Sequence, residues 1–490
     1  MNPHYIPSWQ KVFPNIENAL QKLEQKLIVG FGITPYPRIV PALFLKNYLI
    51  YSAKDTADLD IMRSFVKVFC LEEKFPKAGA KVHAASYLLG NYGFQAFVKS
   101  RREPFYLLLH RTTPAIVKKL EEQHIEWIGN DPASFEEVAL KTNFQELLAK
   151  LNLSHAKTLR FSNEDFATQT FQSLFDQIQQ PFQLQRIYSS IGMEQNPFLV
   201  STQEQWEETL PQLSYGEQFQ EVFVSPIPQG LSLSMVGCAT HLGVLTSSLH
   251  LRFLDIPEIL GDERPSEIFL GHDFQFSSWN ESIEDSAQTI TENVGAYLEK
   301  KGYRGIFSIN FVYDQNTENI VPQECTPQFP EDLHIYSLMI AQLNKVPPMD
   351  VFHLMEHLQM QESFDFQAIN AGLKERMPLS HVFLRPKGIQ EMKLLLSPGV
   401  YSFSQEKKSM TYIKQALFPW EARGTNEFLL IDSVPRHQKP VIQDAPSLFK
   451  LVFPRSIAMS SSKITPDAAG LIARLRAALL QNQQPDSHKI

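Results

Sequence analysis

Residues 281–326 contain the pattern that most restricts the fold of this 490-residue chain, a long amphipathic helix followed at once by a β-hairpin. The apolar residues of the helix recur at helical spacing: Ile283, Ala287, Ile290, Val294 and Leu298. Gly302 is suited to end this helix. Two strands, 305–313 and 319–326, then flank the segment DQNTE, which has the composition of a hairpin turn. The pattern predicts a layer of helix and antiparallel sheet at this point of the chain.

The first 134 residues alternate short helical and strand-like segments, a pattern typical of an α/β layer. Apolar spacing predicts helices at 15–27 and 59–68. The short apolar runs at 47–52 and 104–110 are expected to be buried strands. We therefore expect an N-terminal α/β domain.

The remainder of the chain is expected to mix helices with antiparallel strands. Helices are predicted at 131–151, 204–213, 332–343, 348–361 and 466–480. Strands are predicted within 180–200 and 220–250 and at 382–385, 392–396 and 427–432, with a linker or surface helix at 362–380. The fold class is thus α/β and α+β, with domains at 1–134, 135–225, 226–361 and 381–480 and a disordered tail at 481–490.

The chain is mildly acidic, with 45 Lys and Arg against 53 Asp and Glu and a net charge of −8. A general nucleic-acid binder usually has a basic excess, so we expect no nucleic-acid partner. The N-terminus lacks the basic and apolar regions of a signal peptide, and no run of 18 apolar residues predicts a membrane helix. The 3 cysteines form no CxxC pair, which fits a reducing compartment. We therefore expect a cytoplasmic protein without a membrane partner.

Three standard motifs for phosphate binding or acyl transfer are absent: GxxxxGK[ST], GxGxxG after a strand, and GxSxG. The total of 21 glycines is also low, which argues mildly against a nucleotide enzyme because glycine lets the backbone approach a phosphate. One metal motif is present, since His353, Glu356 and His357 have the HxxEH spacing of an inverted zinc protease helix. Apolar neighbours favour an ordinary core helix there, and no third ligand is evident in the sequence.

The hairpin resembles the metal-binding hairpin of the ATP-grasp superfamily. That family's pattern begins with G-[FY]-x-G, which GYRG at 302–305 matches. The family then has an acid followed by Phe on the first strand, where this chain has Asn310 before its Phe. The second strand ends in Glu-x-Asn-Pro-Arg in the family and in ECTPQ at 324–328 here. The resemblance implies that Glu324, Asn310 and Thr326 bind a metal ion and that Arg304 is a catalytic cation.

Further segments resemble other ATP-grasp elements in the same order along the chain. Lys141 opens a helix where the family has its first phosphate-binding lysine, and Gln185 occupies the position of the second. The segment after it resembles the flexible phosphate loop, which implies nucleotide contacts from Ser189, Ser190 and Gly192. FVSP at 223–226 resembles the hinge that holds adenine, which implies contacts from Val224 and Ser225. Two residues fall in regions that face the phosphates or the acceptor in relatives: Arg252, as a catalytic residue, and Asp273, as a nucleotide contact.

The resemblance covers about 135–360, and 1–134 resembles the α/β domain that precedes it in such ligases. It implies an ADP-forming ligase that activates a carboxylate with ATP and Mg²⁺ and joins it to an amine. The implied partners are therefore a small-molecule carboxylate and amine, such as an amino acid or small peptide, and a homodimer is left open. Three substitutions weigh against catalysis, since Asn310 lacks a charge, Thr326 is a weaker oxygen ligand and Gln328 removes a bidentate cation. The alternative is a degenerate ATP-grasp protein that binds nucleotide or a partner without ligase activity.

Overall fold

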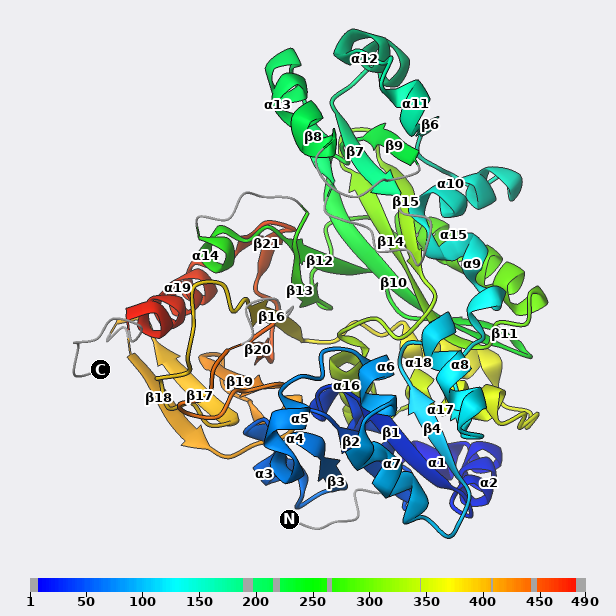
Figure 1. The fold of residues 1–490 in the computed structure, drawn as a ribbon, viewed down its shortest axis with the longest axis vertical. Coiled ribbons are helices and arrows are strands. Elements are labelled where there is room, and N and C mark those ends of the chain that lie inside the picture. Colours follow the sequence, from blue (N-terminus) through cyan, green and yellow to red (C-terminus); the bar gives the residue numbers. More distant parts are fainter. Residues whose placement is uncertain are drawn as a thin grey trace.

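The computed structural model describes residues 8–187, 197–214, 221–261, 267–343, 345–406, 409–441 and 447–481. They form a parallel sheet in the N-terminal part, a small antiparallel sheet that projects from the body, and a large antiparallel sheet (Figure 1). The predicted α/β and α+β architecture is therefore confirmed. No helix of the described ranges is long and apolar enough to cross a membrane.

The N-terminal strands are all parallel and lie in the order β3-β2-β1-β4-β5. They are β1 (Leu27–Gly32), β2 (Tyr48–Ser52), β3 (Lys67–Cys70), β4 (Phe105–Leu109) and β5 (Glu126–Ile128). The helices around them are α1 (Trp9–Val12), α2 (Pro14–Leu23), η1 (Tyr36–Arg38), η2 (Val40–Leu43), α3 (Asp58–Met62), α4 (Leu71–Lys74), α5 (Pro76–Gly79), α6 (Ala85–Leu89), α7 (Tyr92–Lys99) and α8 (Pro114–Glu122). The helix predicted at 15–27 is too long, because α2 ends at Leu23 and the chain then enters the central strand β1. The helix predicted at 59–68 likewise gives way to β3.

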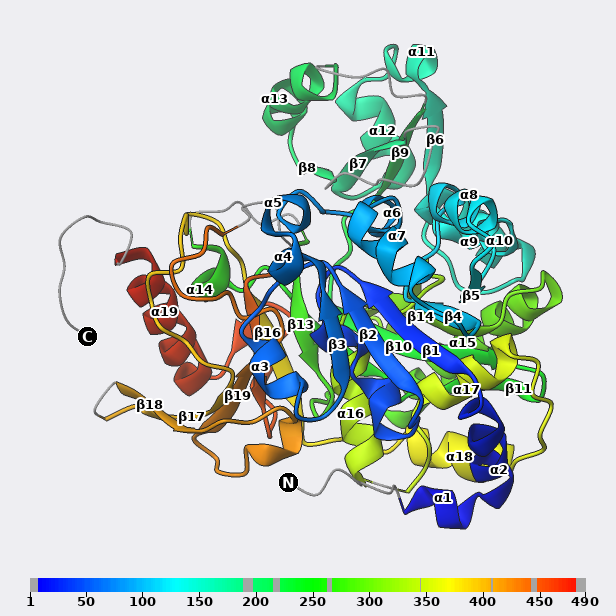
Figure 2. The ribbon, with the colours of Figure 1, turned by 60° about the horizontal axis from the view of Figure 1, so that its bottom comes forward.

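The small sheet has the order β6-β9-β7-β8 and stands apart from the other two sheets (Figure 2). Its strands are β6 (Leu159–Ser162), β7 (Phe182–Ile187), β8 (Phe198–Val200) and β9 (Glu221–Pro226), and its helices are α11 (Asn163–Phe166), α12 (Phe171–Ile178) and α13 (Gln203–Ser214). Apolar side chains of these helices pack on one face of the sheet. The connection from the parallel sheet consists of η3 (Pro132–Ser134), α9 (Glu136–Ala139) and α10 (Lys141–Lys150). The helix predicted at 131–151 is thus interrupted, because Leu140 is extended between α9 and α10.

The large sheet is 11-stranded, in the order β15-β14-β10-β12-β13-β16-β20-β19-β17-β18, with β11 beside β10. Its strands are β10 (Leu231–Thr240), β11 (Gly243–Thr246), β12 (His250–Leu254), β13 (Phe269–Asp273), β14 (Gly305–Asp314), β15 (Asn319–Thr326), β16 (Ser380–Leu384), β17 (Gly399–Ser404), β18 (Ser409–Lys414), β19 (Glu427–Ile431) and β20 (Phe449–Phe453). The remaining elements are α14 (Pro257–Leu260), α15 (Glu281–Lys300), α16 (Leu333–Leu343), α17 (Met349–His357), α18 (Phe366–Leu373), η4 (Pro419–Glu421), β21 (Ala458–Ser460), β22 (Lys463–Ile464) and α19 (Pro466–Gln481).

The C-terminal strands do not form a sheet of their own. Strand β16 pairs with β13, so the strands after residue 380 continue the sheet that begins at the hairpin. A domain boundary at 381 therefore separates segments of one sheet. Residues 392–396 are not the predicted strand, because Met392 exchanges main-chain hydrogen bonds with the irregular segment at 438–439 instead of with a strand.

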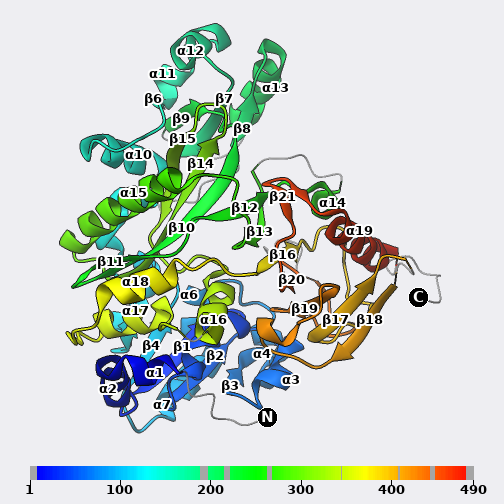
Figure 3. The same cartoon turned by 180° about the vertical axis from the view of Figure 1, so that it is seen from behind.

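Helices cover both faces of the sheet around the hairpin (Figure 3). Helix α15 packs on the face that carries Phe307, and α17 packs on the opposite face, which carries Ile306. Alternate residues of a strand share a face, so Ser308 and Asn310 follow Ile306 on the α17 side. On this face of strand β10, Cys238 and Val236 are apolar, whereas Ser234 and Ser232 are polar. One half of this face is therefore apolar and covered by α17, and the other half is polar.

Candidate functional site

A continuous row of polar side chains crosses one face of the large sheet. Residues directly opposite each other on antiparallel strands point to the same face. The strand register places Glu324 opposite Asn310, Asn310 opposite Ser234, and Ser234 opposite His250. Two residues further along β12, Arg252 lies opposite His272, which in turn lies opposite His381. We call this set the polar row, which consists of Glu324, Asn310, Ser234, His250, Arg252, His272 and His381.

The hairpin end of the polar row holds the three predicted metal ligands. Asn310 Nδ2 donates a hydrogen bond to Glu324 Oε1 at 2.7 Å. Thr326 lies two residues beyond Glu324 on β15, so both side chains point to the same face. The structure therefore brings together a carboxylate, an amide and a hydroxyl, all of which offer oxygen atoms.

Arg252, in the middle of the row, is surrounded by charged groups. Burial lowers the pKa of Arg252, while the negative charges of Glu324, Glu267 and Asp332 oppose that shift. Burial likewise raises the pKa of Glu267, while the positive charges of Lys141 and Arg252 oppose the shift. We call Lys141, Arg252, Glu267 and Glu324 the charged cluster, because each interacts electrostatically with at least one of the others.

Two anchors position the members of the charged cluster that come from outside the sheet. Gln145 in α10 donates from Nε2 to two main-chain oxygens of β15, both at 3.0 Å, and so docks the helix that Lys141 begins. The carboxylate of Asp255 accepts hydrogen bonds from the N–H groups of Glu267 and Ile268, both at 2.9 Å. Asp255 thereby holds Glu267 at the entrance to β13, next to the row.

The other end of the polar row meets a buried charge network. Lys450 Nζ lies 2.8 Å from Asp332 Oδ1 and 2.7 Å from Asp432 Oδ2. His381 Nε2 lies 2.8 Å from Asp332 Oδ2, and His334 Nε2 lies 3.1 Å from Asp432 Oδ2. Burial alone would raise the pKa of both carboxyls, but the Lys450 ammonium and the histidines outweigh it and hold the pKa of each below its usual range.

The predicted nucleotide contacts of the small sheet divide between its two faces. Gln185 and Ser225 are buried on the face away from the helices, where Ser225 Oγ accepts a hydrogen bond from Gln183 Nε2 at 3.0 Å. The side chain of Val224 lies in the core under the helices, so only its main chain could contact a base. The predicted loop contacts lie outside the described residues: Ser189, Ser190 and Gly192.

Two predicted site residues make structural contacts, and their predicted roles stay predictions. The Arg304 guanidinium donates to the main-chain oxygens of Glu299 and Tyr303, both at 2.8 Å, and pairs with the Glu299 carboxylate at 3.0 Å. It therefore caps the end of α15. Asp273 follows His272 in the strand and points to the opposite face. Its Oδ1 accepts hydrogen bonds from the N–H groups of Gln275 and Phe276, and its Oδ2 accepts three from the segment 456–458.

The HxxEH motif does not assemble a metal site. His353 Nδ1 accepts a hydrogen bond from the N–H of Ile306 at 3.2 Å, and His357 Nε2 lies 3.1 Å from the main-chain oxygen of Arg304. Glu356 Oε1 instead accepts hydrogen bonds from the main-chain and ring nitrogens of His241. The three side chains of the motif therefore pin α17 to different parts of the sheet.

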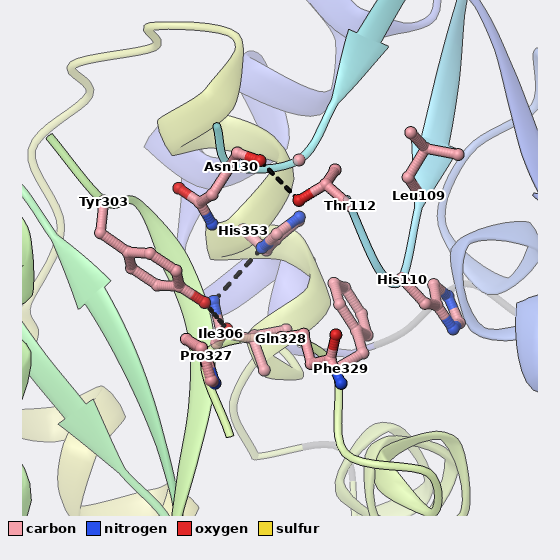
Figure 4. A pocket seen from close by; sticks show the side chains of 11 residues that line it. Leu109, His110, Thr112, Asn130, Tyr303, Ile306, Pro327, Gln328, Phe329 and His353 are labelled. Carbon is pink, nitrogen blue, oxygen red and sulfur yellow. Dashed lines mark hydrogen bonds between the residues drawn. The ribbon is translucent and has the colours of Figure 1, made fainter. Parts of the chain in front are cut away.

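Gln328, which stands where the family has an arginine, lines a small cavity between the parallel sheet and the hairpin (Figure 4). The cavity has room for about one water molecule, which is too little for a substrate. Beside it, the Asn130 side chain exchanges hydrogen bonds of 2.7 and 2.8 Å with the main chain of Arg304. This cavity marks the junction between the N-terminal and central parts of the chain.

Glu267 and the buried charge network were not predicted from the sequence. Glu267 matches no motif position, and it is near its partners only because Asp255 orders the segment before β13. The network does have a local signal, since Lys450 interrupts the apolar strand FKLVF and Asp432 ends the apolar strand EFLLI. A charged residue in such a strand must be paired if the strand is buried.

No protein-family model matches the sequence, and no curated protein does. Among solved structures, the chain is similar to a β-γ-ATP complex of biotin carboxylase from Campylobacter jejuni, with a TM-score of 0.56, 10% identity and 88% of each chain covered. It is also similar to an N5-carboxyaminoimidazole synthase from Aspergillus clavatus in complex with ADP and 5-aminoimidazole ribonucleotide, with a TM-score of 0.50, 10% identity and coverage of 94% and 100%. A third similar structure is the ADP complex of an N5-carboxyaminoimidazole ribonucleotide synthetase, with a TM-score of 0.52, 10% identity and coverage of 94% and 97%. All three are ATP-grasp enzymes, and the likeness over most of the chain shows that this protein has the ATP-grasp fold.

Proposed function

We propose that this protein is an ATP-dependent ligase that activates a carboxylate as an acyl phosphate and joins it to an amine. The observation that carries the proposal is the charged cluster over the polar row. It combines two cations that can neutralise phosphate oxygens, Lys141 and Arg252, with a carboxylate that can hold a metal ion, Glu324. The similar structures are complexes with ATP or ADP, which supports a nucleotide as the ligand of this fold.

In this reaction the chain mainly positions reactants and stabilises charge. Lys141 and Arg252 bind phosphate oxygens, Gln185 takes the place of the second phosphate-binding lysine, and the main chain of Val224 and Ser225 binds the base. The proposed substrates are a small carboxylate and an amine, such as an amino acid or small peptide. We also propose a cytoplasmic location, which suits the free and buried state of all three cysteines.

The oxygen donors at the hairpin suit Mg²⁺, which prefers oxygen ligands and often uses only one or two carboxylates beside phosphates. Glu324 would supply the carboxylate, Asn310 the amide oxygen and Thr326 the hydroxyl. The 2.7 Å hydrogen bond from Asn310 orients Glu324 through Oε1 and leaves Oε2 for the ion. When bound, the ion neutralises charge on the transferred phosphoryl group.

A second candidate is a degenerate ATP-grasp protein that binds nucleotide without turnover. Glu267 is the observation that favours it, because its carboxylate interacts with the same two cations that the phosphates would need. The amide of Asn310 also leaves the hairpin with one negative charge where the family's pattern has two. The missing charge at the hairpin would weaken phosphoryl transfer, and Glu267 would compete with the phosphates for the two cations.

Incubation of the protein with ATP, Mg²⁺ and a panel of amino acids tests the first proposal. A ligase releases ADP and phosphate only when the right carboxylate and amine are both present. Nucleotide binding without ADP release across dipeptide-forming pairs and other small carboxylates supports the degenerate protein. The absence of any nucleotide binding contradicts both.

A further inference from the structure

His272, Asp332 and His381 bring three metal-ligating atoms to one point on the sheet. His272 in β13 and His381 in β16 are directly opposed, and Asp332 reaches them from the turn before α16. Asp332 Oδ2 lies 2.8 Å from His381 Nε2 and 3.5 Å from His272 Nδ1. The three atoms all lie within 4.8 Å of one another, and no other such group of three occurs within the part of the chain that the structure describes.

These three atoms are buried and face one another. The exposed fraction is 7% for His272, 1% for Asp332 and 0% for His381. Asp332 Oδ2 faces both ring nitrogens at ion-pair distances, and no other group of the described residues makes a hydrogen bond to any of these three atoms. The three atoms thus face one another rather than other protein groups, an arrangement that suits one shared ligand.

The charge around the site also calls for a cation. Asp332 and Asp432 both contact Lys450, so two carboxylates share one ammonium in a buried environment. The uncompensated negative charge is costly unless a proton or a metal ion neutralises it.

We propose that His272, Asp332 and His381 bind one divalent first-row transition metal ion, with Zn²⁺ as the representative case. Two imidazole nitrogens and one carboxylate oxygen form a donor set typical of zinc sites that keep an open fourth position. Tetrahedral coordination at about 2.0–2.1 Å separates ligand atoms by about 3.3 Å, so the 2.8 Å His381–Asp332 contact needs to open by about 0.5 Å and the widest separation to close by at most about 1.5 Å. Lys450 bonds to Oδ1 and leaves Oδ2 to the ion.

This site is separate from the proposed Mg²⁺ ligands and goes beyond the proposed ligase reaction. Its nitrogen donors favour a transition metal, whereas the hairpin offers only oxygen atoms. The ion would sit in the polar row at β13 and β16, on the side of Arg252 that lies away from the hairpin. Its binding can therefore be measured without ATP and independently of any turnover.

The test is equilibrium dialysis of the chelator-treated full chain against Zn²⁺ in the presence of excess Mg²⁺, followed by metal analysis. We expect one Zn²⁺ per chain, and about a 100-fold or greater loss of affinity in His381→Ala and Asp332→Asn. His353→Ala, which alters the HxxEH motif, and Glu324→Ala, which alters the hairpin, should keep full Zn²⁺ binding.

Because a ligand variant could fail to fold, Co²⁺ loading of the wild-type chain gives a second readout. A four-coordinate Co²⁺ site has intense visible absorption bands, which Zn²⁺ should then displace at one equivalent. Less than stoichiometric Zn²⁺ binding by the wild-type chain, or a Co²⁺ spectrum like that of the free aqueous ion, overturns the proposal. Zn²⁺ binding that is lost in His353→Ala but kept in His381→Ala overturns it as well.

Discussion

Replacement of Lys450 by methionine should destabilise the protein severely, because the ammonium of Lys450 holds two buried carboxylates. Its side chain is 5% exposed and lies 2.8 Å from Asp332 and 2.7 Å from Asp432. Methionine keeps the apolar stem but removes the charge, which leaves both carboxylates in a buried site without their cation. Removal of one partner from a buried ion pair costs about 3–5 kcal/mol, and we expect the free energy of unfolding to fall by that amount.

Lys345 provides a matched control. Its Nζ also lies 2.7 Å from a carboxylate, that of Glu375, but the two side chains are 61% and 40% exposed. An exposed pair contributes only about 0–1 kcal/mol, so Lys345→Met should be nearly neutral. The comparison keeps the substitution and the contact distance constant, whereas the burial and the number of paired carboxylates differ.

Urea unfolding followed by tryptophan fluorescence measures both variants, at neutral pH and in the presence of a chelator so that bound metal does not contribute. The expected result is a large drop in the midpoint for Lys450→Met and little change for Lys345→Met, at similar slopes. A difference below about 1 kcal/mol between the two variants would refute the view that burial makes the Lys450 network important for stability.

Three further changes test other parts of the structure. Asp273→Ala should cost about 3 kcal/mol or more in urea unfolding, because several buried donors lose their acceptor, and a loss below about 1 kcal/mol would contradict its structural role. Burial and the Lys450 ammonium lower the pKa of His334 to about 4, whereas an unfolded histidine titrates near 6.5. The free energy of unfolding should therefore fall as the pH drops from about 6.5 through 4, and it should fall less steeply in His334→Gln. An equal slope in the two proteins would contradict this assignment of His334. Glu267→Gln should tighten ATP binding without Mg²⁺ by about 10-fold, because it removes a negative charge beside Lys141 and Arg252. Displacement of a fluorescent nucleotide measures the affinity. Weaker binding would instead indicate that Glu267 helps to hold the nucleotide.

The elements predicted best from the sequence are those with complete local signals. Helix α15 and the strands β14 and β15 end within one residue of their predicted bounds, because apolar spacing, Gly302 and the turn residues all agree. Strand β1 was missed because Leu27 continues the apolar spacing of α2. Its strand character comes from burial between β2 and β4, which depends on residues far away in the sequence.

The candidate site was predictable to the extent that its residues belong to one local motif. Glu324, Asn310 and Thr326 share a hairpin, and the period of two along a strand already places Glu324 and Thr326 on one face. The network around Asp332 and Lys450 joins segments more than 100 residues apart, and no local pattern reports that contact.

Arg304 and Asp273, the two predicted site residues with structural contacts, show a limit of motif matching. A match to a motif position does not determine which way a side chain points. His272 belongs to the polar row, whereas the next residue, Asp273, points to the other face of the sheet. Arg304 lies just past the end of α15, where unpaired carbonyl groups of the helix attract its guanidinium.

The most direct test of the ligase proposal is the rate of ADP release with ATP, Mg²⁺ and the substrate pair that supports turnover, in the wild-type chain and in Glu324→Ala. Glu324 is the only carboxylate among the three proposed Mg²⁺ ligands. We predict that its loss lowers the rate by about 100-fold or more, with nucleotide binding in the absence of Mg²⁺ largely kept. Substrate-dependent ADP release by Glu324→Ala at the wild-type rate would contradict the assignment of the hairpin as the metal-binding part of the active site.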